Sequence, residues 1–196
     1  MSASPQAKAI DPGRDRKSRL AIASVCRWLP TPTDASAGTF ILNRLAAMAQ
    51  LADVSIVQPI PFFPGLRPAP AWAESRSRVQ GSIEVQHAPM FYVPGVLKSL
   101  DGRWLGRSIR GLLSDMRRRG TLDIIDAHFG YPEGVGCARV ARELGVPHFI
   151  TIRGLETDVL KRPGVREQLL EAFHSATGVI SVSHSLRAQR FTPSRR

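Results

Sequence analysis

Two short apolar runs joined by one helical segment constrain the fold of this chain more than any other feature of its sequence. Leu122–Ala127 and Val146–Ile152 are rich in apolar residues and have the length of a buried strand. Between them, Glu133–Leu144 repeats apolar residues at helical spacing, and Gly145 stands where a left-handed cap ends a helix. Two strands connected through one helix form a right-handed crossover, so the sequence predicts that they run parallel in one sheet.

Polar loops follow both strands at the same edge of this predicted sheet. His128 comes directly after the first strand, and Arg153 with Gly154 comes after the second. The carboxyl ends of parallel strands meet at one edge, and open α/β sheets bind ligands there. These residues are therefore candidates for a binding site.

The remaining segments extend the same pattern in both directions. Further strands are expected at Leu20–Val25, Asp53–Gln58, Ser82–Ala88 and Thr177–Ser181, and further helices after Gly38, at Trp104–Arg119, at Val165–Ala176 and from Ser183 to Gln189. Six β/α units in this order predict an α/β fold with a doubly wound, Rossmann-like parallel sheet of strand order 3-2-1-4-5-6. The five prolines of Pro59–Ala73 are expected to exclude a central strand or helix, and Pro89–Leu97 is expected to be irregular.

Length and charge set the expected domain organisation. A chain of 196 residues has room for one domain. Much of the net charge of +11 lies at the ends, since residues 1–20 hold five Lys/Arg against two Asp/Glu and residues 187–196 hold four Arg. We therefore expect a disordered basic leader at 1–18, one domain at 19–190 and a tail at 191–196. A nucleic-acid interface is not expected, because such proteins more often cluster charge on one structured face; a weak attraction to an anionic membrane is more plausible.

Apolar content and cysteine usage indicate the compartment. No apolar run approaches the roughly 20 residues of a membrane span, and the first residues lack the apolar core of a signal peptide. Cys26 and Cys137 both lie in apolar surroundings, which favours two buried thiols over a disulfide without excluding the disulfide. These observations predict a cytoplasmic protein, with the inner membrane face as a place of peripheral contact.

The segment DIIDAHFGYPEGVGCARVARELGVPHFITIRGLETD resembles the family-4 glycosyltransferases of the GT-B fold. In that family a strand ending in Ala-His leads to a Gly/Pro loop and a helix, and the next strand ends in Thr-x-His/Arg-Gly-x-x-Asp. Pro30–Leu51 and Gly178–Gln189 extend the resemblance, which covers about residues 19 to 189. The order and spacing of these motifs carry the resemblance together.

The resemblance implies the first, acceptor-side domain of a retaining enzyme that moves a sugar from a nucleotide-sugar donor to a glycan or lipid-linked acceptor. Polysaccharide biosynthesis is the usual setting of such relatives. The donor would bind mostly to a C-terminal domain that this sequence lacks, so the chain alone is expected to transfer little sugar. No metal and no other cofactor is implied.

The same resemblance assigns roles to individual residues. It places His128 beside the transferred sugar as the catalytic residue. The substrate-binding residues that it implies are Gly38, Thr39, Arg153, Gly154 and Asp158. Of these, the first two would contact a phosphate or the acceptor, the next two would line the cleft, and the last would cap or brace it.

Each assignment has a structural alternative. His128 also suits a hydrogen-bonded histidine at a strand end, and Gly38 also suits close packing of a helix on the sheet. Arg153 equally suits an ion pair with Glu156 or Asp158. GLETD places one residue more before the aspartate than the family pattern does, which leaves the carboxylate partner open between these two.

Other protein classes find less support in the sequence. A nicotinamide-dependent dehydrogenase needs a Gly-rich turn directly after its first strand, which SVCRWLPTPTDASAG does not provide. The chain has no Walker lysine motif and no Gly-x-Ser-x-Gly elbow, and its five histidines show no metal-ligand spacing. The alternative to an enzyme domain is a non-catalytic Rossmann-like docking module that completes a partner subunit.

Overall fold

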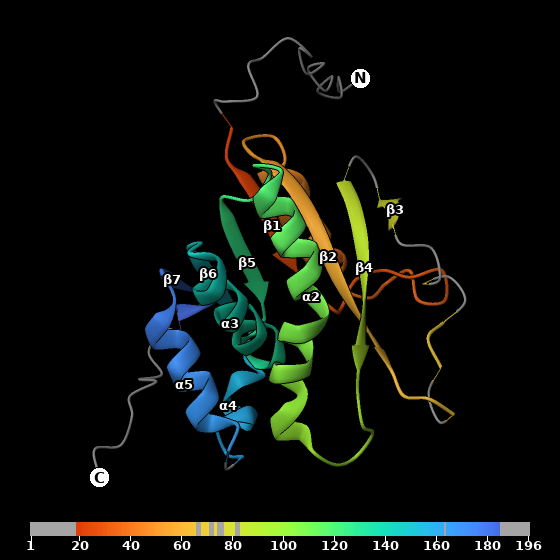
Figure 1. Ribbon diagram of the computed structural model, residues 1–196, viewed down its shortest axis with the longest axis vertical. Helices are drawn as coiled ribbons and strands as arrows, with labels where there is room; N and C mark the ends of the chain where they lie inside the picture. Colours follow the sequence, from red (N-terminus) through yellow and green to blue (C-terminus); the bar gives the residue numbers. More distant parts are fainter. Residues whose placement is uncertain are drawn as a thin grey trace, which may run out of the picture.

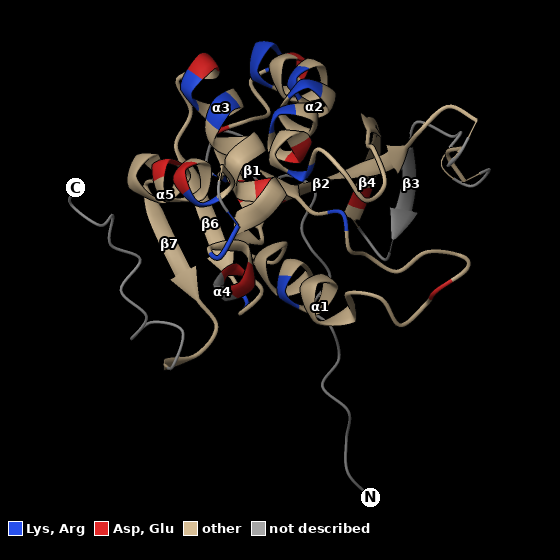
Figure 2. Ribbon diagram, turned by 90° about the horizontal axis from the view of Figure 1, so that it is seen from below, with Lys and Arg blue, Asp and Glu red and all other residues tan. Residues whose placement is uncertain are grey.

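The computed structural model describes residues 19–65, 68–70, 73, 77–80, 83–162 and 164–184. The expected leader 1–18, the tail 191–196 and nearly all of the helix expected from Ser183 to Gln189 lie outside these residues. Over the described range, helices lie in front of a sheet (Figure 1), and a further helix covers its other face (Figure 2). This is the predicted α/β architecture.

A seven-stranded sheet, counted over the described residues, runs in the order β3-β4-β2-β1-β5-β6-β7. Its strands are β1 (Ala21–Val25), β2 (Asp53–Phe62), β3 (Ser77–Gln80), β4 (Ile83–Phe91), β5 (Ile124–His128), β6 (His148–Ile152) and β7 (Gly178–Ser181). All neighbours pair in parallel except β3 with β4. The parallel strands follow the predicted order, and β3 is an antiparallel edge strand that the sequence analysis did not expect.

Helices cover both faces of the sheet. They are α1 (Thr39–Met48), α2 (Asp101–Arg118), α3 (Val135–Leu144), α4 (Glu156–Val159) and α5 (Arg166–Ser175), with a 3-10 turn at Lys98–Leu100 and a π-helical turn at Gly130–Gly134. α2, α3 and α5 pack on one face and α1 on the other (Figure 2). The helices expected between Gly38 and Ala176 are confirmed, and Gly145 ends α3 with a left-handed φ of 62°. None of the helices in the described part of the chain combines the length and apolar composition that a membrane crossing requires.

Side-chain alternation gives the central strands an apolar face and a polar face. Alternate positions of β1, β5 and β6 fill the core beneath α2, α3 and α5: Ala23, Val25, Ile125, Ala127, Ile150 and Ile152. The positions between them point toward α1 and include Ser24, Asp126, His128 and Thr151, all buried. Successive residues of a strand point to opposite faces, so the apolar core and the polar group lie on opposite sides of the same strands.

β2 and β4 run further than their prolines suggested. β2 continues through Pro59 and Pro61 and β4 continues through Pro89, so the expectation of no strand in these segments is wrong. The backbone N–H of Cys26 donates to the carbonyl of Val57 at 3.1 Å, which shows that the odd-numbered residues of β2 face β1. Because β1 ends there, the two prolines of β2 point to a free edge, where a missing N–H costs no ladder hydrogen bond.

Candidate functional site

Three buried polar side chains meet where β1 and β5 end. Ser24 of β1 lies opposite Asp126 of β5 in the parallel ladder, and His128 follows two residues later, so all three face α1. His128 Nε2 lies 2.9 Å from Ser24 Oγ and 3.2 Å from Asp126 Oδ2. All three side chains are buried.

The neighbours of His128 orient its ring and do not make it a base for Ser24. Its Nδ1 lies 3.5 Å from Nη2 of Arg153. A guanidinium only donates, so Nδ1 accepts and Nε2 carries the proton. In a Ser-His-Asp triad the hydroxyl and the carboxylate lie at opposite ring nitrogens, whereas here both lie at Nε2. The cluster therefore has the composition of a triad without its geometry.

Arg44 of α1 compensates the buried carboxylate of Asp126. Its Nη2 lies 3.6 Å from Asp126 Oδ2, and its Nη1 donates to Thr151 Oγ1 at 2.7 Å. Burial alone would raise the pKa of Asp126, but the hydrogen bond from His128 and the positive charge of Arg44 lower it. Through these contacts α1 is tied to both β5 and β6.

The carboxylate of Glu156 joins the loops that follow β5 and β6. Its Oε1 accepts the backbone N–H of Gly130 at 2.8 Å, and its Oε2 accepts those of Arg153 and Gly154 at 3.1 and 2.8 Å. The side chain is buried. A Cβ at Gly130 would lie 2.8 Å from the Leu169 side chain and 2.9 Å from Cγ of Glu156, so the absence of a side chain lets the loop come this close. One anionic side chain thus fixes the spacing of both loops.

Asp158 does not brace this site. Its side chain is 70% exposed and pairs with Lys161 at 2.7 Å. The bracing carboxylate that the resemblance assigned to Asp158 is Glu156, two residues earlier. The additional residue in GLETD is the sequence signal for this shift.

Arg153 forms the outer wall of the site. Its guanidinium lies over the ring of Phe40, with 4.7 Å between Cζ and the ring centroid. Burial and then the charge of Arg44 lower the pKa of Arg153, yet an arginine stays cationic at physiological pH. The side chain is partly exposed while His128 behind it is not, so the arginine is what a ligand meets first.

Gly38 and Thr39 lie beside this wall, at the start of α1. Gly38 has a φ of 62°, and a Cβ there would lie 2.1 Å from the carbonyl oxygen of Trp28, which is a steric reason for glycine without any ligand. Thr39 is exposed. The ring of Phe40 packs edge-on against Trp28, with 6.0 Å between the ring centroids, and it lies under the guanidinium of Arg153. The first turn of α1 is therefore next to Arg153.

A second polar cluster at this edge has no counterpart in the sequence analysis. Arg27, which follows β1, donates from Nε to Glu133 Oε1 at 2.9 Å, and its carbonyl accepts from Gln58 at 3.3 Å. Burial alone would lower the pKa of Arg27, but the charge and hydrogen bond of Glu133 raise it. Burial also raises the pKa of Asp101, at the start of α2. The position of Arg27 just after a buried strand could have marked it as a site residue. Its partner Glu133 could not be identified in the same way, because it lies 106 residues away.

Thiol and metal chemistry find no support in the described residues. Cys26 and Cys137 are buried free thiols, and burial raises the pKa of both, so neither supplies a thiolate at neutral pH. Within the described ranges, no group of three or more His, Cys, Asp or Glu side chains gathers as metal ligands would. The chemistry that this edge offers is binding and orientation by cationic side chains and an ordered imidazole.

Comparisons with known proteins show the fold and nothing finer. No family model matches the sequence, and no curated protein matches it. UGT2 of Phytolacca americana, in complex with UDP-2-fluoro-glucose and pterostilbene, superposes with a TM-score of 0.52 at 13% identity over 89% of this chain and 52% of that chain. Apo UGT2 of the same plant gives a TM-score of 0.48 at 15% identity, covering 82% of this chain and 45% of its own. Arabidopsis thaliana UGT89C1 with UDP gives 0.49 at 13% identity, covering 84% and 45%.

The chain spans about half the length of these solved structures. The similarity to UGT2 in its complex agrees with the predicted Rossmann-like α/β fold class, because it covers 89% of this chain at a TM-score of 0.52. Membership of family 4 is a prediction that this similarity does not test.

Replacing Glu156 with Gln should destabilise the fold far more than replacing Asp158 with Asn. Glu156→Gln keeps the shape but removes the charge that three N–H groups share, and hydrogen bonds to charged groups contribute about 1.5–3 kcal/mol each, so we expect a loss of about 2–3 kcal/mol. Asp158→Asn disrupts only an exposed pair and should change stability by less than about 0.5 kcal/mol. Urea unfolding measures both, and equal losses would show that Glu156 does not join the loops.

Replacing Asp126 with Asn should cost stability at neutral pH and cost less in acid. Because the pKa of Asp126 is lowered in the folded state, its ionised form stabilises the protein above its ordinary pKa of about 3.9. That contribution is lost as the pH falls through the lower folded value. Urea unfolding at pH 7 should show a gap of about 2 kcal/mol between the two proteins. The gap should narrow at pH 3, and a constant gap would contradict the lowered pKa.

Proposed function

We propose that this chain is the acceptor-side half of a retaining, nucleotide-sugar-dependent glycosyltransferase with the two-lobed GT-B fold. The observation that carries the proposal is the convergence of His128, Arg153 and Glu156 at the carboxyl edge of a doubly wound sheet. The fold similarity to UGT2, whose structure holds UDP-2-fluoro-glucose and pterostilbene, supports it. So does the resemblance of the central segment to the family-4 enzymes.

In this proposal Arg153 engages the ligand first. Its guanidinium donates to phosphate or hydroxyl oxygens, and turning it outward breaks its 3.5 Å approach to His128 and its contact with the ring of Phe40. That movement exposes Nδ1 of His128 to the transferred sugar, while Asp126 holds the ring from the other side. Gly38 and Thr39 contribute backbone N–H groups at the start of α1, which donate to a phosphate or acceptor oxygen.

The proposal includes a second lobe over the same edge. Trp28, Phe40 and Leu155 are 50%, 43% and 58% exposed and follow or flank the ends of β1 and β6, so they present apolar surface that a facing lobe would cover. That lobe would also bind most of the donor and neutralise its leaving phosphate. Residues 19–190 alone therefore transfer little sugar, and robust turnover by the unaided chain would contradict this.

The resemblance to the family-4 glycosyltransferases supports a proposal for the acceptor, and the net charge supports one for membrane contact. The acceptor is proposed to be a glycan or a lipid-linked glycan in polysaccharide biosynthesis, made on the cytoplasmic side of a membrane. The net charge of +11 supports a peripheral contact with anionic lipid. No metal or other cofactor enters this proposal.

The exposed apolar surface favours one other candidate, a non-catalytic Rossmann-like module that completes a partner subunit. Thermal-shift measurements separate the two. A nucleotide sugar or glycan that raises the Tm of the chain alone favours the transferase half. Stabilisation by a partner chain and by no small molecule favours the module, and stabilisation by NADH would favour a dehydrogenase instead.

Binding to a glycan array tests the acceptor-side role. We expect the chain to bind a limited set of glycans, and Arg153→Ala to weaken that binding by about tenfold or more, because it removes charge-assisted hydrogen bonds. Arg142→Ala is the matched control, since it removes an arginine that is 60% exposed on α3 and paired with Glu171. Binding to no glycan, or equal binding by the two variants, would contradict the proposal.

A further inference from the structure

Two grooves on the outer side of α2 share one arginine. The first is an aromatic groove of about 370 Å³ lined by Phe62, Pro89, Phe91, Trp104, Arg107 and Ser108. The second is an arginine groove of about 200 Å³ between α2 and α3, whose basic residues are Arg103, Arg107, Arg110 and Arg139. Arg107 therefore stands between an apolar slot and a basic one. Figure 2 shows the basic segments of α2 and α3 on one side of the molecule.

The aromatic groove is an open apolar slot. Phe91 is 38% exposed, and its ring packs edge-on against Trp104 at 5.1 Å and Phe62 at 6.3 Å. Rings that pack on one another in this way wall a slot for an apolar segment. They are not spaced as separate platforms on which successive nucleic-acid bases would stack.

The arginine groove is narrow because two helices approach closely. A Cβ at Gly136 of α3 would lie 2.9 Å from the backbone nitrogen of Gly106 of α2, so the helices meet through glycine. Arg103, Arg107 and Arg139 are exposed at the two sides of this contact. α2 alone carries five arginines against two aspartates, so the charge is clustered here as well as at the chain ends.

Among the described residues, three of the four arginines have no carboxylate partner. Arg110 pairs with Glu143 at 2.6 Å. Within the described residues, no carboxylate pairs with Arg103, Arg107 or Arg139. Like charges confined to one groove repel, so an anion that enters it is favoured, and arginine matches phosphate oxygens in geometry.

We propose that these grooves form one binding site for an amphiphile with a phosphate head and an apolar chain. The phosphate lies against Arg103, Arg107 and Arg139, and the first part of the chain lies in the aromatic groove. A volume of about 370 Å³ falls at the lower end of small-molecule sites, which run from roughly 300 to 1,000 Å³, so it holds one chain segment. The site is independent of the proposed transfer chemistry, because none of its lining residues belongs to the His128 cluster.

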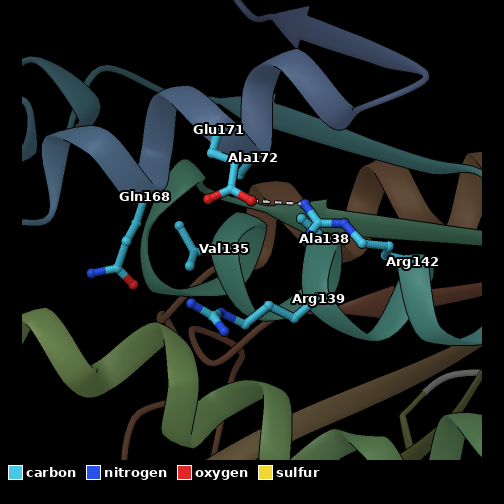
Figure 3. Close-up of a pocket in the computed structure, with 7 residues that line it drawn as sticks. All are labelled: Val135, Ala138, Arg139, Arg142, Gln168, Glu171 and Ala172. Carbon is cyan, nitrogen blue, oxygen red and sulfur yellow. Dashed lines mark hydrogen bonds and ion pairs between the residues drawn. The ribbon is translucent and has the colours of Figure 1, made fainter.

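A neighbouring cavity between α3 and α5 shares Arg139 with the arginine groove but is too small to hold the amphiphile (Figure 3). Its volume of about 50 Å³ suits a few waters, and Arg142 at its wall is already bonded to Glu171 at 2.9 Å. The unpaired cations and the apolar slot meet at Arg107, which lines both grooves.

Calorimetric titration with dodecyl phosphate, kept below its critical micelle concentration, tests this site. We expect the purified chain to bind it at least about tenfold more tightly than inorganic phosphate or the uncharged amphiphile dodecyl maltoside, because each of these lacks one half of the interaction. Arg107→Gln should weaken dodecyl phosphate binding about tenfold. Arg118→Gln is the matched control, since it removes a charge from the same helix, 72% exposed and outside both grooves, and should change binding less than about twofold.

Ser108→Phe gives an independent variant that fills the aromatic groove and leaves the arginines in place. It should reduce the affinity for dodecyl phosphate to that for inorganic phosphate, with an unchanged Tm as the check on folding. Equal effects of Arg107→Gln and Arg118→Gln would overturn the site, because they indicate diffuse charge attraction. Three other results would overturn the site. Inorganic phosphate could bind as tightly as dodecyl phosphate, or single-stranded RNA could bind more tightly. The chain could also bind only to vesicles containing phosphatidylglycerol.

Discussion

The interaction on which the functional edge depends is the acceptance of three backbone N–H groups by one buried carboxylate. Glu156 receives those of Gly130, Arg153 and Gly154, which belong to the loops after β5 and β6. A buried N–H without an acceptor costs about 1–3 kcal/mol, so these loops take their course because the acceptor is there. His128 and Arg153 approach each other as a consequence, since each is attached to one of the joined loops.

The strands beneath this edge satisfy two requirements with one sequence. Their apolar positions pack under α2, α3 and α5, and the positions between them carry Ser24, Asp126 and His128 toward α1. Burying a charged group without a partner costs free energy, and Arg44 supplies the compensating charge for Asp126 from the helix above. The outer side of α2 carries the arginine groove and the aromatic groove, which share no residue with this polar group.

Much of this arrangement could be predicted because it follows from local pattern. The β5–α3–β6 unit, the strand order and the position of His128 and Arg153 at one edge come from apolar periodicity and from the rules for parallel sheets. The extent of β2 could not be predicted, because whether Pro59 interrupts a strand depends on whether a neighbour lies on its side. The choice of Glu156 over Asp158 also needed the fold, since both follow β6 and only one reaches Gly130. The pairing of Arg27 with Glu133 joins residues 106 positions apart, which local pattern does not reveal.

Hydrogen exchange of individual backbone amides tests most directly whether one carboxylate joins the two loops. Nuclear magnetic resonance resolves the amides of Gly130 and Gly154 separately, although both lie in loops that would exchange quickly if they were exposed. We expect both amides to be protected and to open with similar free energies, because the same acceptor holds them. Exchange of either amide at the rate of an unstructured chain would contradict this expectation.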